Sequence, residues 1–339
     1  MNSGQKIGDD SWQIGPVVVR SRAVLAPLSG VTDAVFRRIA KRLGAGLVIS
    51  EMVASDELVQ GSPEARLRAE GSGIEPHVVQ LAGCDPRWMA EAVRVAEDSG
   101  ARIVDINMGC PAKRVVGGYA GSALMRDLDL AARLIEAAVS AASVPVTVKM
   151  RLGWDQGSVN APELAQRAQA LGVRAVTVHG RTRQQFYKGT ADWAAIAPVA
   201  KAVAIPVIAN GDVGDGEGAK RCIRQSGATA VMVGRAAVGQ PWLPAMIGAS
   251  LQGITLAAPE PHIRGDVAVE HYEGLLSLYG LDTGLRHARK HLAAYADVAI
   301  ADGFEVAAQT RRDLVTTEEP NAVVRLLREL YAERTRKAA

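Results

Sequence analysis

One unit recurs from Ala23 to Gly234: a short apolar run, a polar or glycine-rich stretch, and then a helical pattern. The apolar runs are continuous rather than alternating, which is typical of parallel strands covered on both faces. Eight strands are predicted, at Ala23–Pro27, Leu47–Glu51, His77–Leu81, Ile103–Asn107, Val146–Met150, Ala175–His179, Val207–Asn210 and Ala230–Val233. The helices predicted between them include Pro86–Ser99, Ala123–Ala142, Pro162–Leu171 and Gly216–Ser226.

This alternation predicts a parallel α/β fold, and eight units within about 210 residues match the size of a (β/α)₈ TIM barrel. A doubly wound sheet is the competing fold, but it usually has a glycine-rich fingerprint after its first strand. Here Leu28–Ser29–Gly30 follows that strand. We therefore predict a TIM barrel over residues 1–250, in which residues 1–22 supply a β element, Trp12–Arg20, that closes the barrel floor.

The repeating unit stops after Gly248, and the rest of the sequence has a different character. Gln252–Gly265 is predicted to be a loop, because it carries Pro259 and Pro261. Helices are predicted at His271–Tyr279, Leu285–Ile300, Ala307–Thr316 and Asn321–Ala338. We expect residues 251–339 to form a C-terminal all-helical domain.

Composition narrows the class of protein further. The hydrophobic fraction of 48% and the mean hydropathy of +0.05 exclude a disordered chain. Three cysteines, Cys84, Cys110 and Cys222, without a C-x-x-C pair argue against a disulfide framework or a structural metal site. Neither a secretory segment within Met1–Asp10 nor an apolar run of membrane-spanning length is present. We expect a cytoplasmic monomer without a metal or a membrane partner.

Active sites of TIM barrels lie at the carboxyl ends of the strands. In this sequence, most of those ends carry a side chain that can form hydrogen bonds or titrate. They are Ser29, Glu51, Gln80, Asn107, Cys110, Lys149, Arg151, His179, Asn210, Asp212 and Arg235, with Gly211 and Gly234 beside the last two. Each of these residues could instead have a purely structural role; His179, for example, could be a buried core histidine. Their convergence on one rim of the barrel favours a functional site.

The loops after the last two strands predict a phosphate site. Asn210–Gly211–Asp212 follows strand seven, and Gly234–Arg235 follows strand eight and opens a short helix. Such loops commonly bind phosphate in these barrels, because glycines let backbone N–H groups approach and arginine adds a forked cation. Ordinary tight turns are the alternative.

Lys149 and Cys110 are the candidates for chemistry. A lysine within the apolar run Val146–Met150 would be costly without a partner, so it indicates an anionic or electron-rich ligand, with a Schiff base as the alternative. Cys110 precedes a long glycine-rich loop, Val115–Gly121, and is predicted to act as a nucleophile or as a neutral proton donor. Cys84 and Cys222 are assigned structural roles.

Three segments resemble the tRNA-dihydrouridine synthases, and most closely their bacterial DusB-like branch. They are Leu25–Asp33 (LAPLSGVTD) with Phe36–Arg37, Asp105–Lys113 (DINMGCPAK) and Gly121–Leu124. Supporting matches are Val148–Arg151, Val178–Arg181, Asn210–Asp212, Val233–Arg235 and Arg286–His291. The resemblance covers nearly the whole chain.

The resemblance implies a flavin-dependent barrel that reduces the C5=C6 bond of a uridine in the D-loop of tRNA with NADPH. By this resemblance FMN is held by Pro27, Leu28, Ser29, Gln80, Lys149, His179, Asn210, Gly211, Asp212, Gly234 and Arg235. Cys110 would donate a proton, Lys149 would stabilise the reduced flavin, and Asn107 would hold the uracil or the flavin edge. Leu28 departs from the methionine usual in the family, although a hydrophobe is kept.

Basic residues are the predicted contacts with tRNA. They are Lys113, Arg114, Arg151, Arg181 and Arg183 on barrel loops, and Arg286, Arg289 and Lys290, with His291 beside them, on one predicted helix. A solvated helix face is the alternative for the last group. A net charge of +3 neither requires nor excludes a polyanionic partner.

Two other functions stay open on the sequence alone. A small-molecule FMN reductase of the dihydroorotate dehydrogenase type would share the phosphate site, but would not need the C-terminal helices. A non-catalytic RNA-binding or regulatory protein would not need Cys110 and Lys149.

Overall fold

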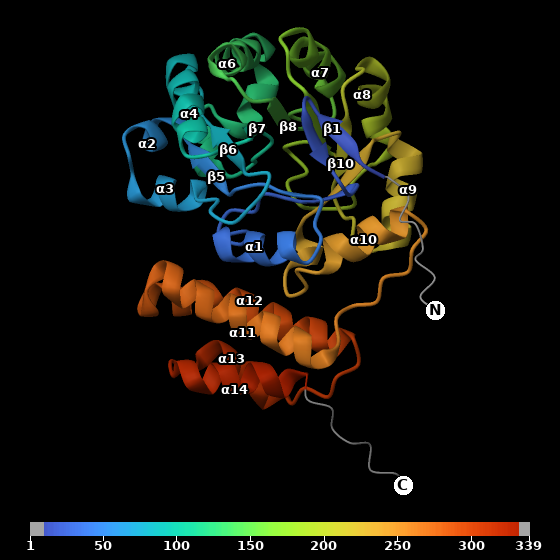
Figure 1. The fold of residues 1–339 in the computed structure, drawn as a ribbon. Coiled ribbons are helices and arrows are strands. Elements are labelled where there is room, and N and C mark those ends of the chain that lie inside the picture. The colour runs from blue at the N-terminus through green and yellow to red at the C-terminus, as the bar shows by residue number, and fades with distance from the viewer. Residues whose placement is uncertain (1–9, 332–339) are drawn as a thin grey trace.

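The computed structural model describes residues 10–331, and its central element is a closed parallel barrel (Figure 1). The strands are β3 (Ala23–Leu25), β4 (Leu47–Val48), β5 (Met52–Ala54), β6 (Val78–Ala82), β7 (Ile103–Met108), β8 (Val146–Arg151), β9 (Ala175–His179), β10 (Val207–Asn210) and β11 (Ala230–Val233). Each pairs in parallel with the next along the chain, except β4 and β5, which are two parts of one interrupted strand. Because β11 also pairs with β3, the barrel closes, and the predicted (β/α)₈ fold is confirmed.

Strand register brings the polar strand ends to one rim. Asn107 pairs with Lys149 across β7 and β8, and His179 pairs with both Arg151 and Asn210. Since all strands run the same way, their carboxyl ends meet at the same mouth of the barrel.

Helices cover the outside of the barrel, and some of them begin at aspartate caps. The covering helices are α1 (Ala34–Arg42), α2 (Ser55–Val59), α3 (Pro63–Ala69), α4 (Pro86–Asp98), α6 (Leu128–Ala141), α7 (Ala161–Ala170), α8 (Ala197–Ala202), α9 (Gly216–Ser226) and α10 (Leu243–Leu251). Asp33, Asp85, Asp127 and Asp215 accept hydrogen bonds from first-turn N–H groups of α1, α4, α6 and α9. The predicted helix Ala123–Ala142 is therefore divided at Asp127, and a 3-10 segment, η1 (Gly121–Arg126), precedes the cap.

A two-stranded hairpin lies at the amino-terminal end of the barrel. It consists of β1 (Trp12–Ile14) and β2 (Val17–Val19), which pair antiparallel. Trp12, Ile14 and Val19 are buried in one apolar cluster with barrel residues such as Ile103 and Ala230, which begin or nearly begin their strands. Their burial fills the end of the barrel opposite the polar rim.

Four helices follow the barrel: α11 (Pro261–Tyr279), α12 (Leu281–Ala301), α13 (Ala308–Thr316) and α14 (Pro320–Leu330). They share an apolar core of their own, which includes Tyr272, Leu292 and Leu327. Helix α11 begins at Pro261, ten residues before the predicted start, because proline is well suited to the first turn; the predicted loop is thus wrong for residues 261–265. Residues 332–338 of the last predicted helix lie outside the described residues.

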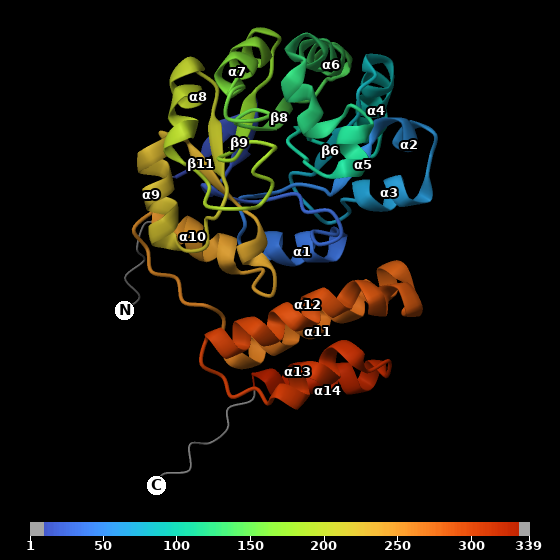
Figure 2. The same cartoon turned by 180° about the vertical axis from the view of Figure 1, so that it is seen from behind.

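The helical domain packs beneath α1 and α10, as both views show (Figures 1 and 2). Val35 and Ile39 of α1 form an apolar cluster with Trp242 and with Val267 of α11. Gly274 permits this approach, because a Cβ atom there would lie 2.5 Å from the Val35 side chain. Among the described residues, no helix has both the length and the apolar character needed to cross a bilayer.

Candidate active site at the barrel mouth

A cavity of about 840 Å³ opens at the carboxyl ends of the strands. Every residue predicted to be catalytic or to hold the cofactor lines it. These are Pro27, Leu28, Ser29, Gln80, Asn107, Cys110, Lys149, His179, Asn210, Gly211, Asp212, Gly234 and Arg235. The structure thus brings together, in one concave site, residues that span more than half of the chain.

Asn107 belongs to a buried chain of hydrogen bonds across three strands. Its Nδ2 donates to Oε1 of Gln80 over 2.8 Å, and Nε2 of Gln80 donates to Oδ2 of Asp105 over 2.6 Å. Thr147 donates to the other oxygen of Asp105 over 2.6 Å. Each amide and carboxyl group has a defined partner, so the orientation of Asn107 toward the cavity is fixed. Burial raises the pKa of Asp105.

The backbone of Cys110 is held from both sides. Oδ1 of Asn107 accepts hydrogen bonds from the N–H groups of Gly109 and Cys110, over 3.1 and 2.9 Å. The carbonyl of Cys110 accepts from N and Oγ of Ser122, over 3.0 and 2.9 Å. Gly121 has φ +60°, and a Cβ there would lie 2.8 Å from the Cys110 carbonyl oxygen, so the loop requires glycine at this position.

The other two cysteines lie elsewhere, as their assignment to structural roles requires. Cys222 is buried in α9, and burial raises the pKa of its thiol to about 12. Cys84 follows β6 and does not line the cavity.

Lys149 directs its ammonium group along the cavity wall. Its Nζ donates to Oδ1 of Asn210 over 3.2 Å, and Asn210 in turn donates from Nδ2 to the carbonyl of Met232 over 2.9 Å. Desolvation, together with the charge of Arg151, lowers the pKa of Lys149 to about 8. The charge of Asp105 opposes this shift, but within residues 10–331 no carboxylate forms a hydrogen bond with Lys149. An anionic or electron-rich ligand in the cavity would therefore stabilise its charged form.

The predicted phosphate end of the cavity has a cationic rim. Arg235, whose side chain is 62% exposed, donates to Oδ1 of Asp212 over 3.2 Å. Gly211 has φ +119°, and a Cβ there would lie 2.6 Å from Ala191 and 2.9 Å from the His179 ring. The short helix predicted after Gly234 is only a single 3-10 turn, η3 (Arg235–Ala237), so it adds no helix dipole to the site.

His179 lies beside this rim as a neutral imidazole. Desolvation and the charges of Lys149 and Arg151 lower its pKa to about 2. Its Nε2 lies 3.3 Å from Nη1 of Arg181, so the neutral ring accepts there.

Arg151 and Arg181 differ from the other predicted tRNA contacts, because both are buried. Arg181 donates to both oxygens of Asp212, over 3.1 and 2.5 Å, and to the carbonyls of Lys188 and Gly189. Arg151 donates to the carbonyls of Gly109, Thr182 and Phe186. We therefore replace the expected tRNA contact of these two arginines with a structural role, since they hold the loop that follows β9.

The remaining predicted tRNA contacts are accessible, with one exception. Lys113 and Arg114 are exposed on a short helix, α5 (Lys113–Gly117), and Arg114 lines the cavity. Arg183 is half-buried and lies over the ring of Trp154. Arg286, Arg289 and Lys290 are exposed on α12. The exception is His291, which is buried, since it faces the barrel instead of solvent.

Sequence reasoning did not single out Tyr187, which also lines the cavity. Its ring lies under the guanidinium groups of Arg235 and Arg151, at 5.4 and 5.6 Å from the ring centroid. The available signal was an aromatic pair, Phe186–Tyr187, in the loop after β9 of a chain with only 4% aromatic residues.

Solved structures with the same fold are distant in sequence. A 6-hydroxypseudooxynicotine amine oxidase from Pseudomonas geniculata N1 superposes with TM-score 0.56 at 16% identity, over 78% of this chain and 52% of that one. A histamine dehydrogenase from Rhizobium sp. 4-9 superposes with TM-score 0.57 at 13% identity. The match covers 97% of this chain and 65% of that one. These likenesses concern the fold.

Sequence relatives are much closer. Proteins named probable tRNA-dihydrouridine synthase in Rhizobium leguminosarum and Rhodobacter capsulatus are 53% and 50% identical, over 87% and 96% of this chain and 92% and 98% of theirs. A tRNA-dihydrouridine synthase B of Xanthomonas campestris is 45% identical over 94% of this chain and 95% of its own. The family model described as dihydrouridine synthase matches residues 24–335. The chain belongs to the dihydrouridine synthase family.

Proposed function

We propose that this protein reduces the C5=C6 bond of a uridine in tRNA, with FMN as the bound cofactor and NADPH as the electron donor. The observation that carries the proposal is the convergence of Cys110, Asn107 and Lys149 on one cavity of a (β/α)₈ barrel. The names of relatives that match nearly end to end at 45–53% identity support the same reaction. A D-loop uridine is the target suggested by the resemblance to the DusB-like branch.

The residues of the cavity fit a flavin. Lys149 offers a buried cation whose hydrogen bond goes to the neutral amide of Asn210, which suits the electron-rich pyrimidine edge of the ring. Leu28 offers an apolar wall, and Gly211, Gly234 and Arg235 offer backbone and guanidinium donors to a phosphate. When bound, the flavin supplies the hydride that is added to C6 of the uracil. The protein contributes orientation and electrostatics.

Cys110 is the proton donor in this proposal. Addition of hydride at C6 leaves negative charge on C5 and O4 of the uracil. The Cys110 thiol then transfers its proton to C5, and the resulting thiolate recovers a proton from solvent. General acid catalysis of this kind contributes roughly 10²–10⁴ in rate. Asn107 supports the step, because its Oδ1 binds the N–H of Cys110 and fixes the loop that carries the thiol.

Contact with tRNA is proposed for exposed cations around the mouth. The target uridine must leave its base stack to enter the cavity, so the rest of the tRNA has to be held by its backbone and shape. Arg114 stands at the cavity edge, with Lys113 beside it. Arg183 on the barrel and Arg286, Arg289 and Lys290 on α12 extend the surface.

The experiment that tests the proposal is formation of dihydrouridine on unmodified tRNA, with FMN and NADPH, by the wild type and by Cys110→Ala. Product with the wild type and a large loss in the variant support both the reaction and the acid. Equal activity of the two proteins would move the proton donor elsewhere. No product from either, with a yellow NADPH-reducible protein, would favour a small-molecule reductase instead. A colourless protein that binds tRNA would favour a non-catalytic role.

A further inference from the structure

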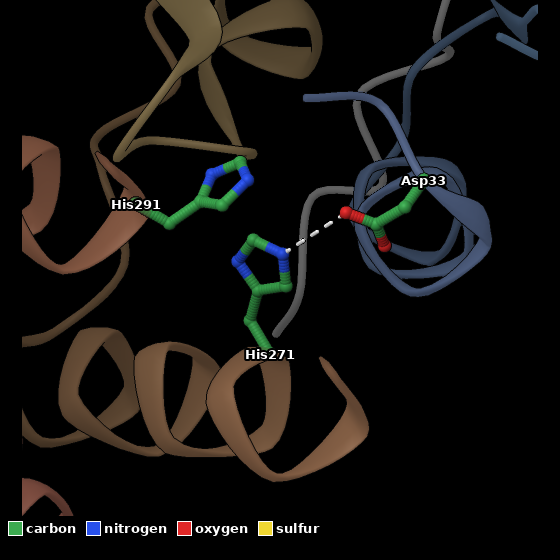
Figure 3. Close-up of side chains that lie close together, drawn as sticks. All are labelled: Asp33, His271 and His291. Carbon is green, nitrogen blue, oxygen red and sulfur yellow. Dashed lines mark ion pairs between the residues drawn. The ribbon is translucent and has the colours of Figure 1, made fainter. Parts of the chain in front are cut away.

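Three ionisable side chains meet between the barrel and the helical domain, outside the cavity. Asp33 precedes α1, His271 belongs to α11 and His291 to α12; their exposed fractions are 3%, 0% and 1%. Figure 3 shows a ring nitrogen of His271 facing the Asp33 carboxylate, and Nε2 lies 3.7 Å from Oδ2. Asp33 is 238 or more positions away from the two histidines in the sequence, so its proximity to them depends on how the helical domain docks on the barrel.

His271 connects the two layers through both of its nitrogens. Oδ1 of Asp33 caps α1, where it accepts from the N–H groups of Val35 and Phe36 over 2.9 and 3.0 Å, which leaves Oδ2 free to face His271. On the other side, Nδ1 of His271 lies 3.1 Å from the hydroxyl of Tyr295. Burial raises the pKa of Asp33, but His271 and the cap hold it at about 2, so the carboxylate is ionised.

A shared metal ion is the alternative interpretation of this cluster of two histidines and an aspartate. One potential ligand atom from each of the three side chains lies within 4.8 Å of the other two. Two imidazoles that bind one ion at about 2.0–2.1 Å must each point a nitrogen at it, with the ion between the rings. Here the two rings are in edge-to-face contact, with centroids 4.5 Å apart and planes at 66°. Phe36 packs on both rings, at 5.3 and 6.0 Å. The arrangement favours a packed contact, in which Nδ1 of His271 faces the Tyr295 hydroxyl and Nε2 faces the Asp33 carboxylate at ion-pair distance.

The contact is coupled to the cavity by a short turn. The N–H groups of Val31 and Thr32 both donate to the carbonyl of Leu28 over 2.9 Å, and Oγ1 of Thr32 accepts from the N–H of Leu28 over 2.8 Å. Leu28 and Ser29 line the cavity at one end of this turn. Asp33 follows it directly at the other end, so a shift of Asp33 is transmitted to the cavity wall.

Helix α12 reaches the same turn. Lys290 immediately precedes His291, and its Nζ lies 3.6 Å from the position that a Cβ of Gly30 would occupy. Gly30 is held in turn by Glu51, whose Oε1 accepts from the N–H of Gly30. One helix therefore carries both a buried contact with α1 and a cation beside the loop that lines the cavity.

We propose that Asp33 and His271 are positioning residues for the tRNA substrate. Their contact sets the helical domain relative to the turn at Leu28–Asp33, and so places the target uridine in the cavity. This inference rests on the proposed function. The inference predicts different effects on the two half-reactions. Reduction of a bound flavin by NADPH should need only the barrel, whereas reduction of uridine should also need the docked helical domain.

The test compares kcat/KM for tRNA with the rate at which NADPH reduces the bound flavin. Asp33→Asn keeps a cap acceptor for α1, and His271→Asn places its amide near the Nδ1 position, away from Asp33. Each variant is expected to lower kcat/KM for tRNA by about ten-fold or more, and the double variant to lose no more than either one alone. His271→Gln, whose longer side chain reaches toward the Nε2 position, should recover part of the activity. Flavin reduction should keep its wild-type rate in all of them.

The matched control is His287→Asn, on the same helix one turn before His291, where the ring stacks on Tyr279 instead of entering the cluster. It should behave as the wild type. Wild-type tRNA turnover in Asp33→Asn and His271→Asn, additive losses in the double variant, or an equal loss of flavin reduction would overturn the inference. Stoichiometric zinc in the isolated protein would overturn it in favour of a metal site. A wild type that makes no dihydrouridine would remove the proposed function, and the inference with it.

Discussion

Nζ of Lys149 lies 3.2 Å from Oδ1 of Asn210, and this bond joins the ends of β8 and β10 across the barrel mouth. The partner of Lys149 is a neutral amide, and Nδ2 of Asn210 donates a hydrogen bond to the carbonyl of Met232. The charge of Lys149 is thus oriented but not neutralised by a hydrogen-bonded carboxylate. Desolvation, together with the charge of Arg151, lowers the pKa of Lys149 to about 8, so the charge of the lysine should respond to an anionic or electron-rich ligand in the cavity.

The affinity for FMN should depend on pH through Lys149. Below pH 8 Lys149 is already charged in the free protein, so FMN can bind without uptake of a proton. Above pH 8 binding must take up a proton, so affinity should fall by up to about ten-fold per pH unit. Titration of flavin fluorescence below and above pH 8 measures this. Lys149→Gln should bind more weakly with little pH dependence, and a wild-type dependence that persists in Lys149→Gln would assign the effect to another group.

The cofactor-free protein should be more stable with methionine at position 149. The pKa of Lys149 is about 8 in the folded state, below the ordinary value of 10.5, so the folded state binds fewer protons than the unfolded one between these values. Stability therefore rises with pH from about 8 to 10.5, and below pH 8 the buried charge costs at most about 3 kcal/mol. Urea unfolding should show Lys149→Met more stable than the wild type at neutral pH, with the difference shrinking as the pH is raised. A constant difference would mean that the charge is not its cause.

Cys110→Ala should lower the rate of dihydrouridine formation by roughly 10²–10⁴, because it removes the general acid. Reduction of bound flavin by NADPH should continue at the wild-type rate, since that half-reaction does not use the thiol. Single-turnover kinetics with tRNA added to the reduced enzyme separates the two. Cys84→Ala is the control, because Cys84 lies outside the cavity; a comparable loss there would show that general disruption explains both variants.

Substitution of exposed basic residues should affect tRNA binding, whereas substitution of a buried arginine should affect stability. Lys113→Ala and Arg286→Ala should weaken tRNA binding and each reduce the slope of log affinity against log salt by about 1, as loss of a phosphate contact does. Arg181→Ala should instead lower stability by about 1–3 kcal/mol, because it removes the hydrogen bonds of a buried guanidinium to Asp212 and to two loop carbonyls. Thermal unfolding and salt-dependent binding assays check this. A reduced salt slope with unchanged stability in Arg181→Ala would restore its role as a tRNA contact.

The barrel and its rim were predictable because both follow from local pattern. Continuous apolar runs located the strands to within a few residues, and parallel strands necessarily bring their carboxyl ends together. The burial of Arg181 was not predictable, since its partner Asp212 lies 31 residues away and its other acceptors are loop carbonyls. His291 adjoins Lys290 in sequence, but neighbours on a helix differ by about 100° in direction, so one faces solvent and the other faces α1. The way in which the helical domain docks on the barrel determines which of these two residues is buried.

Gly211→Ala should impair both stability and flavin binding. The residue has φ +119°, and a Cβ would lie 2.6 Å from Cβ of Ala191 and 2.9 Å from the ring of His179, so the loop after β10 would have to move. A cost of about 1–3 kcal/mol is expected from the backbone strain alone. Thermal unfolding and flavin titration measure the two effects. Gly214→Ala is the matched control, three residues farther along, where a Cβ would make an ordinary 3.7 Å contact with Ala236. Because Gly214 has neither the left-handed backbone nor the close contact, equal losses in the two variants would contradict the steric account of Gly211.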